Sequence, residues 1–259
     1  MHYETPKLKK VSKIKHVILE KYFPPWARIL GSANRTLVYV DCFAGAGRYA
    51  DGEEGSPLLI LRKVQQLVEN NRFSSSVRLI FVEKDRQAAD ALQSRILESQ
   101  PSGLRVMVFN QDAHEFVPQL LGAIPEGTPS FFFIDPYGHP LPIPVMNEIL
   151  SRSKTEILLT LMWYALNRHL SNPQVKTAID KMFGEDQWTN QPFMKQKGRE
   201  REDSFINYFL AQLKAKYKLT FRIRFSPEDN VPPEARRTKY YLVHLANHIK
   251  AALLMKEVM

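Results

Sequence analysis

The sequence has almost no cysteine. Its 259 residues include one, Cys42, so no disulfide can form within the chain. Such scarcity is typical of proteins from reducing compartments, and the opening residues, MHYETPKLKK, lack the apolar segment of a secretion signal. We therefore expect a cytoplasmic protein.

Long apolar runs are also absent. Stretches such as Phe131–Ile134 and Ile157–Leu161 have the length of a strand, and no run approaches the roughly 18 residues that cross a membrane. With 44% hydrophobic and 24% charged residues, the composition is that of an ordinary globular protein. We expect a folded protein with no membrane partner.

Negative charge is in deficit. The chain has 36 Lys and Arg against 27 Asp and Glu, for a formal net charge of +9. The segment from Lys195 to Lys250 holds thirteen basic and six acidic residues, hence +7 of that total. A basic surface of this kind fits RNA or DNA as partner, although it can also serve solubility alone.

Five short apolar runs alternate with helix-compatible stretches. The runs are Thr36–Asp41, Val77–Glu83, Leu104–Phe109, Ser130–Asp135 and Thr155–Leu161, and the stretches between them are Pro57–Asn70, Gln87–Ser99, Ala113–Leu121 and Pro144–Leu150. This alternation predicts a parallel sheet with helices on both faces.

The pattern changes after Ala165. Two helical stretches, Asn172–Phe183 and Glu200–Lys216, precede two strands, Thr220–Phe225 and Lys239–Leu245. A terminal antiparallel pair predicts an α/β, Rossmann-like class I methyltransferase fold with a mostly parallel seven-stranded sheet. A fold of the NAD-binding type would end on parallel strands.

We expect a single domain over residues 1–259. Residues 1–35 form an N-terminal helical extension, in which Pro24 and Pro25 break or kink a helix over Lys13–Leu30. Residues 166–219 form a helical insertion before the last two strands.

The strongest local signal follows the first strand, in Asp41-Cys42-Phe43-Ala44-Gly45-Ala46-Gly47. Ligands of open α/β sheets bind at this edge, and glycines let the backbone approach them closely. The segment is similar to methyltransferase motif I, so we assign Asp41, Phe43, Gly45 and Gly47 to S-adenosylmethionine. Two alternatives are a tight turn without a ligand and a dinucleotide site. A pyrophosphate needs a helix N-terminus near the glycines, whereas here the next helix signal is Ser56-Pro57.

Two more acids follow strands. Glu83 ends the second strand and is placed to accept hydrogen bonds from ribose hydroxyls, or is a surface carboxylate beside Lys84. Asp112 and Ala113 follow the third strand at the position that contacts adenine in this fold. Asp112 would serve equally well as the N-cap of the next helix.

Asp135, Pro136 and Tyr137 close the fourth strand, where motif IV faces the transferred methyl group. We assign these three residues to the acceptor side of the site. The related amine-binding motif has a second proline, which is missing here, so amine methylation is less favoured. The alternative is a proline-bearing turn with a packed tyrosine.

Cysteine and histidine add no further chemistry. Cys42 lies in the cofactor loop, away from the position of a thiol nucleophile in base methylation, and is interpreted as a small buried residue. The seven histidines form no metal-ligand pattern, so we predict no metal site. His139 is either a proton acceptor beside the motif IV turn or a solvated loop residue.

Segments along nearly the whole chain resemble the three-Cys-motif partner protein family. They are KHVILEKYFPPWARIL, YVDCFAGAGRYADGEEGSPL, FVEKD, FIDPYG, LMWYALNRHL and YYLVHLANHIKAALLMKEVM. The resemblance implies a methyltransferase-like fold, S-adenosylmethionine as cofactor and a partner protein that bears a cysteine motif. It names no substrate.

Two functions follow. The first is an S-adenosylmethionine-dependent methyltransferase whose acceptor the sequence does not identify, with RNA or DNA favoured. The alternative is a catalytically silent scaffold that docks a cysteine-motif partner. For nucleic acid we expect one basic surface. Its members are Lys214, Lys216 and Lys218 at a helix end, Arg222 and Arg224 on one side of a strand, and Arg236, Arg237 and Lys239 just before the last strand.

Overall fold

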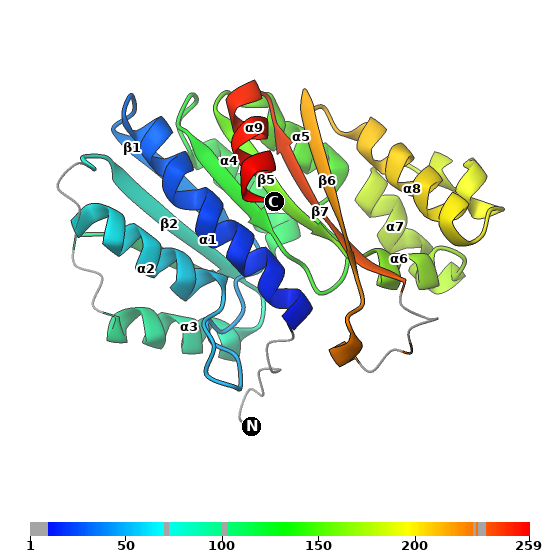
Figure 1. Cartoon of the computed structure of the whole chain (residues 1–259), viewed down its shortest axis with the longest axis horizontal. Coiled ribbons are helices and arrows are strands. Elements are labelled where there is room, and N and C mark those ends of the chain that lie inside the picture. The colour runs from blue at the N-terminus through cyan, green and yellow to red at the C-terminus, as the bar shows by residue number, and fades with distance from the viewer. Residues whose placement is uncertain (1–9, 70–72, 100–102, 230–231, 233–236) are drawn as a thin grey trace.

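The computed structural model describes residues 10–69, 73–99, 103–229, 232 and 237–259. Its centre is one seven-stranded sheet with the order β3-β2-β1-β4-β5-β7-β6 (Figure 1). The strands are β1 (Thr36–Asp41), β2 (Ser76–Glu83), β3 (Arg105–Asn110), β4 (Ser130–Ile134), β5 (Thr155–Leu161), β6 (Tyr217–Arg224) and β7 (Thr238–Ala246).

Strand direction confirms the predicted fold class. Strands β1 to β5 pair in parallel, while β7 is antiparallel to both of its neighbours, β5 and β6. The protein therefore has the Rossmann-like fold of class I methyltransferases. The carboxyl ends of β1, β2 and β4 lie together at one edge of the sheet, where such folds bind ligands.

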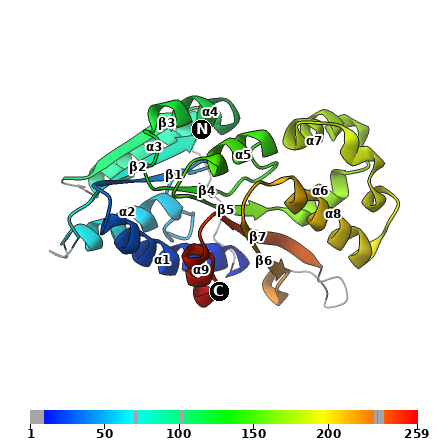
Figure 2. The same ribbon diagram turned by 90° about the horizontal axis from the view of Figure 1, so that it is seen from above.

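Helices cover both faces of the sheet (Figure 2). One face carries α1 (Lys10–Gly31), α2 (Ser56–Glu69), α3 (Arg86–Glu98) and α9 (Ile249–Val258). The other carries α4 (Ala113–Ala123), α5 (Ile143–Ser151), α6 (Trp163–His169), α7 (Lys176–Phe183) and α8 (Gly198–Gln212). No helix within the described ranges is long and apolar enough to cross a membrane.

The central strands are apolar on both sides because both faces are covered. In β4, Phe131 and Phe133 pack toward α1, while Phe132 packs toward α4 and α5, and all three rings are fully buried. Continuous apolar runs are typical of such doubly covered parallel strands.

Helix α1 does not break at its prolines, so that part of the sequence prediction was wrong. It runs for 22 residues through Pro24 and Pro25. Packing outweighs the backbone hydrogen bonds that the prolines remove, because Phe23 and Trp26 are almost fully buried beside Phe131.

A buried polar group also fixes α1 on the sheet. Glu156 of β5 accepts hydrogen bonds from the Tyr22 hydroxyl at 2.5 Å and from Trp26 Nε1 at 3.1 Å. On the β7 side, His244 Nε2 lies 3.0 Å from the same carboxylate. Leaving the buried Glu156 carboxylate without these donors would be costly, so the contacts specify the position of α1.

The chain after β5 differs from the prediction in several places. Helix α8 ends at Gln212, and Lys218 lies in β6, so Lys214, Lys216 and Lys218 do not lie on a helix. The strand begins early because Tyr217 pairs with Ala246. Helices α6 and α9 were not predicted, and Asn172–Phe183 divides into a 3₁₀ turn and α7.

Candidate active site

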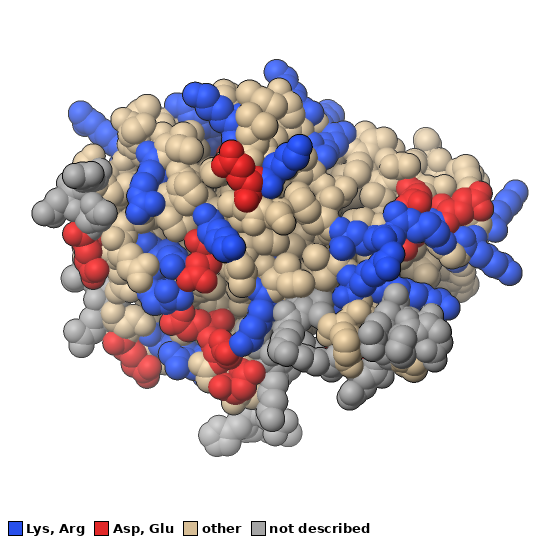
Figure 3. All heavy atoms as spheres, viewed as in Figure 1, with Lys and Arg blue, Asp and Glu red and all other residues tan. Residues whose placement is uncertain are grey.

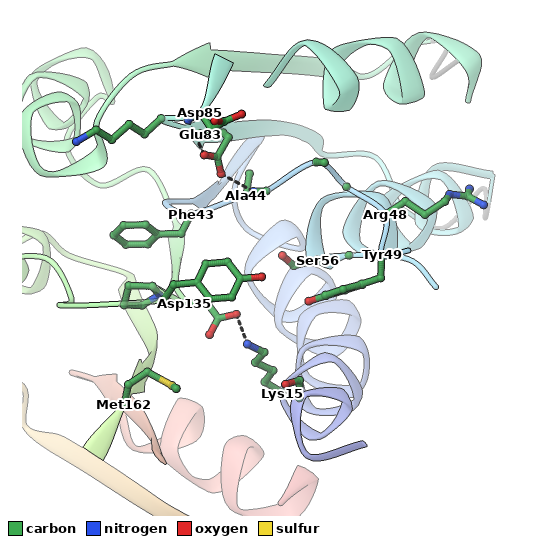
Figure 4. Close-up of a pocket in the computed structure, with 18 of the residues that line it drawn as sticks. Lys15, Phe43, Ala44, Arg48, Tyr49, Ser56, Glu83, Asp85, Asp135 and Met162 are labelled. Carbon is green, nitrogen blue, oxygen red and sulfur yellow. Dashed lines mark hydrogen bonds and ion pairs between the residues drawn. The ribbon is translucent and has the colours of Figure 1, made fainter. Parts of the chain in front are cut away.

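A cavity of about 720 Å³ lies at the carboxyl ends of β1, β2 and β4 (Figure 4). Seven of the predicted site residues line it: Phe43, Gly45, Gly47, Glu83, Asp135, Pro136 and Tyr137. The cavity also receives the first turns of α1, through Ser12 and Lys15, and the start of β7, through Lys239 and Tyr240. Three predicted residues, Asp41, Asp112 and Ala113, are not part of its wall.

The glycine loop forms the inner wall. Gly45 and Gly47 have φ of +64° and +79°, a backbone conformation that glycine adopts without strain. The chain then leaves the site and returns, since the Gly55 N–H donates to the Gly47 carbonyl at 2.8 Å. As a result, Ser56 at the start of α2 lines the cavity although the sequence delays this helix. The sequence distance between the glycines and α2 therefore does not distinguish this site from a dinucleotide site.

Asp41 lies behind the loop and distinguishes this site from a dinucleotide site more clearly than the delayed helix does. Its carboxylate is fully buried and accepts hydrogen bonds from the Ser56 hydroxyl at 2.6 Å and the Phe43 N–H at 3.2 Å. Burial raises the pKa of Asp41 to about 7, although both hydrogen bonds act in the opposite direction. The Asp41 carboxylate is hydrogen-bonded to Ser56 at the start of α2 and disfavours a negatively charged pyrophosphate at that helix end. A cationic ammonium group suits this carboxylate better.

Glu83 is held directly beside the glycine loop. One carboxylate oxygen accepts the Gly45 N–H at 2.8 Å and the other accepts the Asp85 N–H at 2.8 Å. Each oxygen keeps a further lone pair for a hydroxyl donor. The carboxylate is thus oriented by the backbone before any ligand binds, and it faces the cavity (Figure 4).

Asp112 is the N-cap of α4, the alternative that the sequence left open. It accepts the His114 N–H at 3.0 Å and the Lys84 ammonium at 2.6 Å. The hydrogen bond from Lys84 is the main cause that lowers the pKa of Asp112 to about 2. Ala113 follows it and is buried. Lys84 lines the cavity, whereas Asp112 and Ala113 do not.

Asp135 forms an ion pair with Lys15 of α1 across the cavity (Figure 4). Only 13% of the Lys15 side chain and 14% of the Asp135 side chain are exposed to solvent. Pro136 is buried, whereas Tyr137 is 82% exposed at the cavity mouth. The motif IV turn therefore presents one paired acid inward and one aromatic ring outward.

Sequence reasoning missed the part of the wall that comes from distant segments. Lys15, Tyr49, Met162 and Tyr240 all line the cavity. Nothing near Lys15 in the sequence marks it as a site residue, because its partner lies 120 positions away. Tyr49 lies within the long loop after the glycines, and the length of that loop was the one sequence feature that could have indicated a role in the site.

Cys42 and His139 lie outside the cavity wall. Cys42 is buried, as predicted, and burial raises the pKa of its thiol. His139 is partly buried, and burial lowers the pKa of its imidazole. Among the described residues, no three His, Cys, Asp or Glu side chains are grouped to hold a metal ion.

No family model and no curated protein matches the sequence. Among solved structures, the chain is similar to protein LPL1258 from Legionella pneumophila, with a TM-score of 0.50 and 13% identity over 93% of this chain and 90% of that one. It is also similar to precorrin-6y C5,15-methyltransferase from Geobacter metallireducens, with a TM-score of 0.43 and 12% identity over 95% of each chain. A third is an rRNA methylase from Streptococcus thermophilus, with a TM-score of 0.40 and 9% identity over 86% of this chain and 93% of that one. At these identities the likeness concerns the fold alone.

Proposed function

We propose that the protein is an S-adenosylmethionine-dependent methyltransferase that acts on RNA or DNA. One observation carries the proposal: a backbone-held Glu83 and an ion-paired Asp135 line the same cavity beside a glycine loop. Glu83 suits the ribose hydroxyls of the cofactor, and Asp135 would lie where an acceptor meets the methyl group.

The described residues fit the cofactor. Glu83 would bind the ribose, Gly45 and Gly47 would lie against the methionine chain, and Phe43 would pack on the ligand. Asp41 would attract the amino group from behind the loop, and Asp112 and Ala113 would border the adenine. When bound, S-adenosylmethionine supplies an electrophilic methyl group.

The chain's own residues would then position the acceptor. Lys15 engages Oδ2 of Asp135, so Oδ1 can accept a hydrogen from the acceptor group. Tyr137 offers an exposed ring for stacking, and Pro136 fixes the turn. Most of the rate gain would come from holding the acceptor in line with the methyl group.

The proposal is tested by methyl transfer from labelled S-adenosylmethionine to total RNA, DNA and protein. We expect label in a nucleic-acid fraction, and a much weaker signal with Asp135→Ala that still binds the cofactor. Label confined to protein would contradict a nucleic-acid acceptor.

A silent scaffold is the second candidate, and one surface favours it. Helices α1 and α9 are in contact, and each exposes a large apolar side chain, Ile29 at 51% and Leu253 at 52%. Apolar side chains exposed on adjacent helices can dock another protein, which here would be the cysteine-motif partner that the resemblance implies. A tight complex without methyl transfer to any substrate pool would favour this function.

A further inference from the structure

A surface of aromatic and basic side chains extends from the cavity mouth across α6 and the ends of β6 and β7. We call it the basic-aromatic surface. Its members are Tyr164, Arg168, Arg222, Arg224, Phe225 and Arg237. Figure 3 shows Lys and Arg side chains gathered on this side of the molecule, over the lower part of β6 and beside α8.

The aromatic members form a continuous path from the cavity. Lys239, which lines the cavity, has its ammonium 5.4 Å from the centre of the Phe225 ring. Phe225 meets Tyr164 edge-to-face at 4.8 Å between ring centres. The Arg168 guanidinium lies 5.6 Å from the Tyr164 ring centre, and Tyr164 is 41% exposed.

The arginines lie beside this path. Phe221 and Ile223 of β6 pack toward the core, so Arg222 and Arg224 point to the other face of the strand. The Phe225 N–H donates to the Arg237 carbonyl at 3.1 Å, which brings Arg237 alongside Arg224. Arg236, also expected in this surface, lies outside the described residues.

The charge of these arginines is not neutralised within the described ranges. Arg168, Arg224 and Arg237 are exposed, and none of them forms an ion pair with a described carboxylate. By contrast, Lys239 is paired with the buried Asp229 at 2.8 Å. Arginine side chains bind phosphates, and accessible aromatic rings stack on unpaired bases.

From this arrangement we infer that the basic-aromatic surface binds a single-stranded nucleic acid and leads one unpaired nucleotide past Tyr137 into the cavity. The methylation step rests on the proposed function, whereas strand binding does not. A single strand is required because a base within a duplex cannot reach a recessed site without leaving its stack. Bases that stack on Tyr164 and Tyr137 would be unpaired for the same reason.

The inference is tested by fluorescence anisotropy with labelled 20-nucleotide RNA and DNA of mixed sequence, each as single strand and as duplex, over a salt series. We expect at least one single strand to bind more tightly than its duplex. The triple variant Arg168→Ser, Arg224→Ser, Arg237→Ser should lose roughly tenfold or more in affinity at low salt. The slope of log affinity against log salt should flatten by about 0.7 for each phosphate that the variant no longer neutralises.

Two further variants sharpen the test. Tyr164→Ala leaves the charge unchanged and should weaken single-strand binding by roughly tenfold, because a ring on which bases stack is removed. The matched control Arg28→Ser, Arg105→Ser, Lys256→Ser removes three exposed positive charges elsewhere and should change affinity by less than about twofold. Circular dichroism confirms that each variant is folded.

Each outcome is decisive. Equal binding of duplex and single strand, unchanged affinity of the triple variant, an equal loss in the matched control, or no binding at low salt would overturn the inference. Strand binding without any S-adenosylmethionine binding would keep the surface and overturn the methyltransferase. Cofactor binding without strand binding would keep the proposed cofactor site and overturn the proposed surface.

Discussion

Lys15 and Asp135 form an ion pair that joins the helix before the sheet to the end of β4. The pair lies inside the cavity wall, and both side chains are mostly removed from solvent. The N-terminal helix is therefore a component of the candidate active site. Its position is fixed at the other end by the hydrogen bonds from Tyr22 and Trp26 to Glu156.

This ion pair should show measurable coupling in a double-mutant cycle. Lys15→Met and Asp135→Asn should each lower the free energy of unfolding, and the double variant should lose less than the sum. We expect a coupling of roughly 0.5–3 kcal/mol by urea denaturation, because the pair is only 13–14% exposed. The pair of Lys13 and Glu53, with side chains 41% and 48% exposed, is the control and should couple by less than about 1 kcal/mol. Equal coupling in both pairs would show that burial of the Lys15 pair has no energetic effect.

Glu83 should contribute to cofactor binding, and the protein should still fold when it is replaced. Glu83→Ala is expected to weaken S-adenosylmethionine binding by roughly 1.5–3 kcal/mol, because a charged acceptor of ribose hydroxyls is removed. Calorimetric titration measures this change, and Glu98→Ala, an exposed acid of α3, is the control. Unchanged affinity of Glu83→Ala would remove this residue from the site.

Asp41 should make stability depend on pH. Its pKa is about 7 in the folded protein, against about 3.9 when unfolded, so between these values the folded state binds more protons. The contribution of protonated Asp41 to the free energy of unfolding is therefore fully present below about pH 4 and is lost as the pH rises through 7. The amide side chain in the variant Asp41→Asn does not titrate, and its Oδ1 can accept the Phe43 N–H while its Nδ2 donates to the Ser56 hydroxyl oxygen.

The free energy of unfolding of Asp41→Asn should therefore rise relative to that of the parent protein as the pH increases from about 4 to about 7. The expected total is on the order of 4 kcal/mol, with a plateau above that range. Urea denaturation at several pH values measures it. A difference that stays constant with pH would mean that Asp41 does not have the buried environment seen in the structure.

The sequence predicted the fold from patterns that are local in the chain. Apolar runs at Thr36–Asp41 and Thr155–Leu161 became strands with the predicted bounds, since strands covered on both faces need continuous apolar residues. The helix break at Pro24 was wrongly predicted because propensity is local, while the packing of Phe23 and Trp26 that overrides it is not.

The candidate site was only partly predictable for the same reason. Residues directly after a strand, such as Glu83 and Asp135, were identified because parallel strands bring their carboxyl ends together. Lys15 could not be found, since only the tertiary packing of α1 brings it to Asp135. The placement of Asp41 behind the wall depends on the return of the chain from Gly47 to Gly55, which spacing does not reveal.

Calorimetric titration of the full chain with S-adenosylmethionine tests the central claim most directly. We predict saturable binding at one site per chain, and no binding of NAD under the same conditions. If the protein is folded by circular dichroism and gives no binding heat up to millimolar S-adenosylmethionine, the methyltransferase assignment is contradicted.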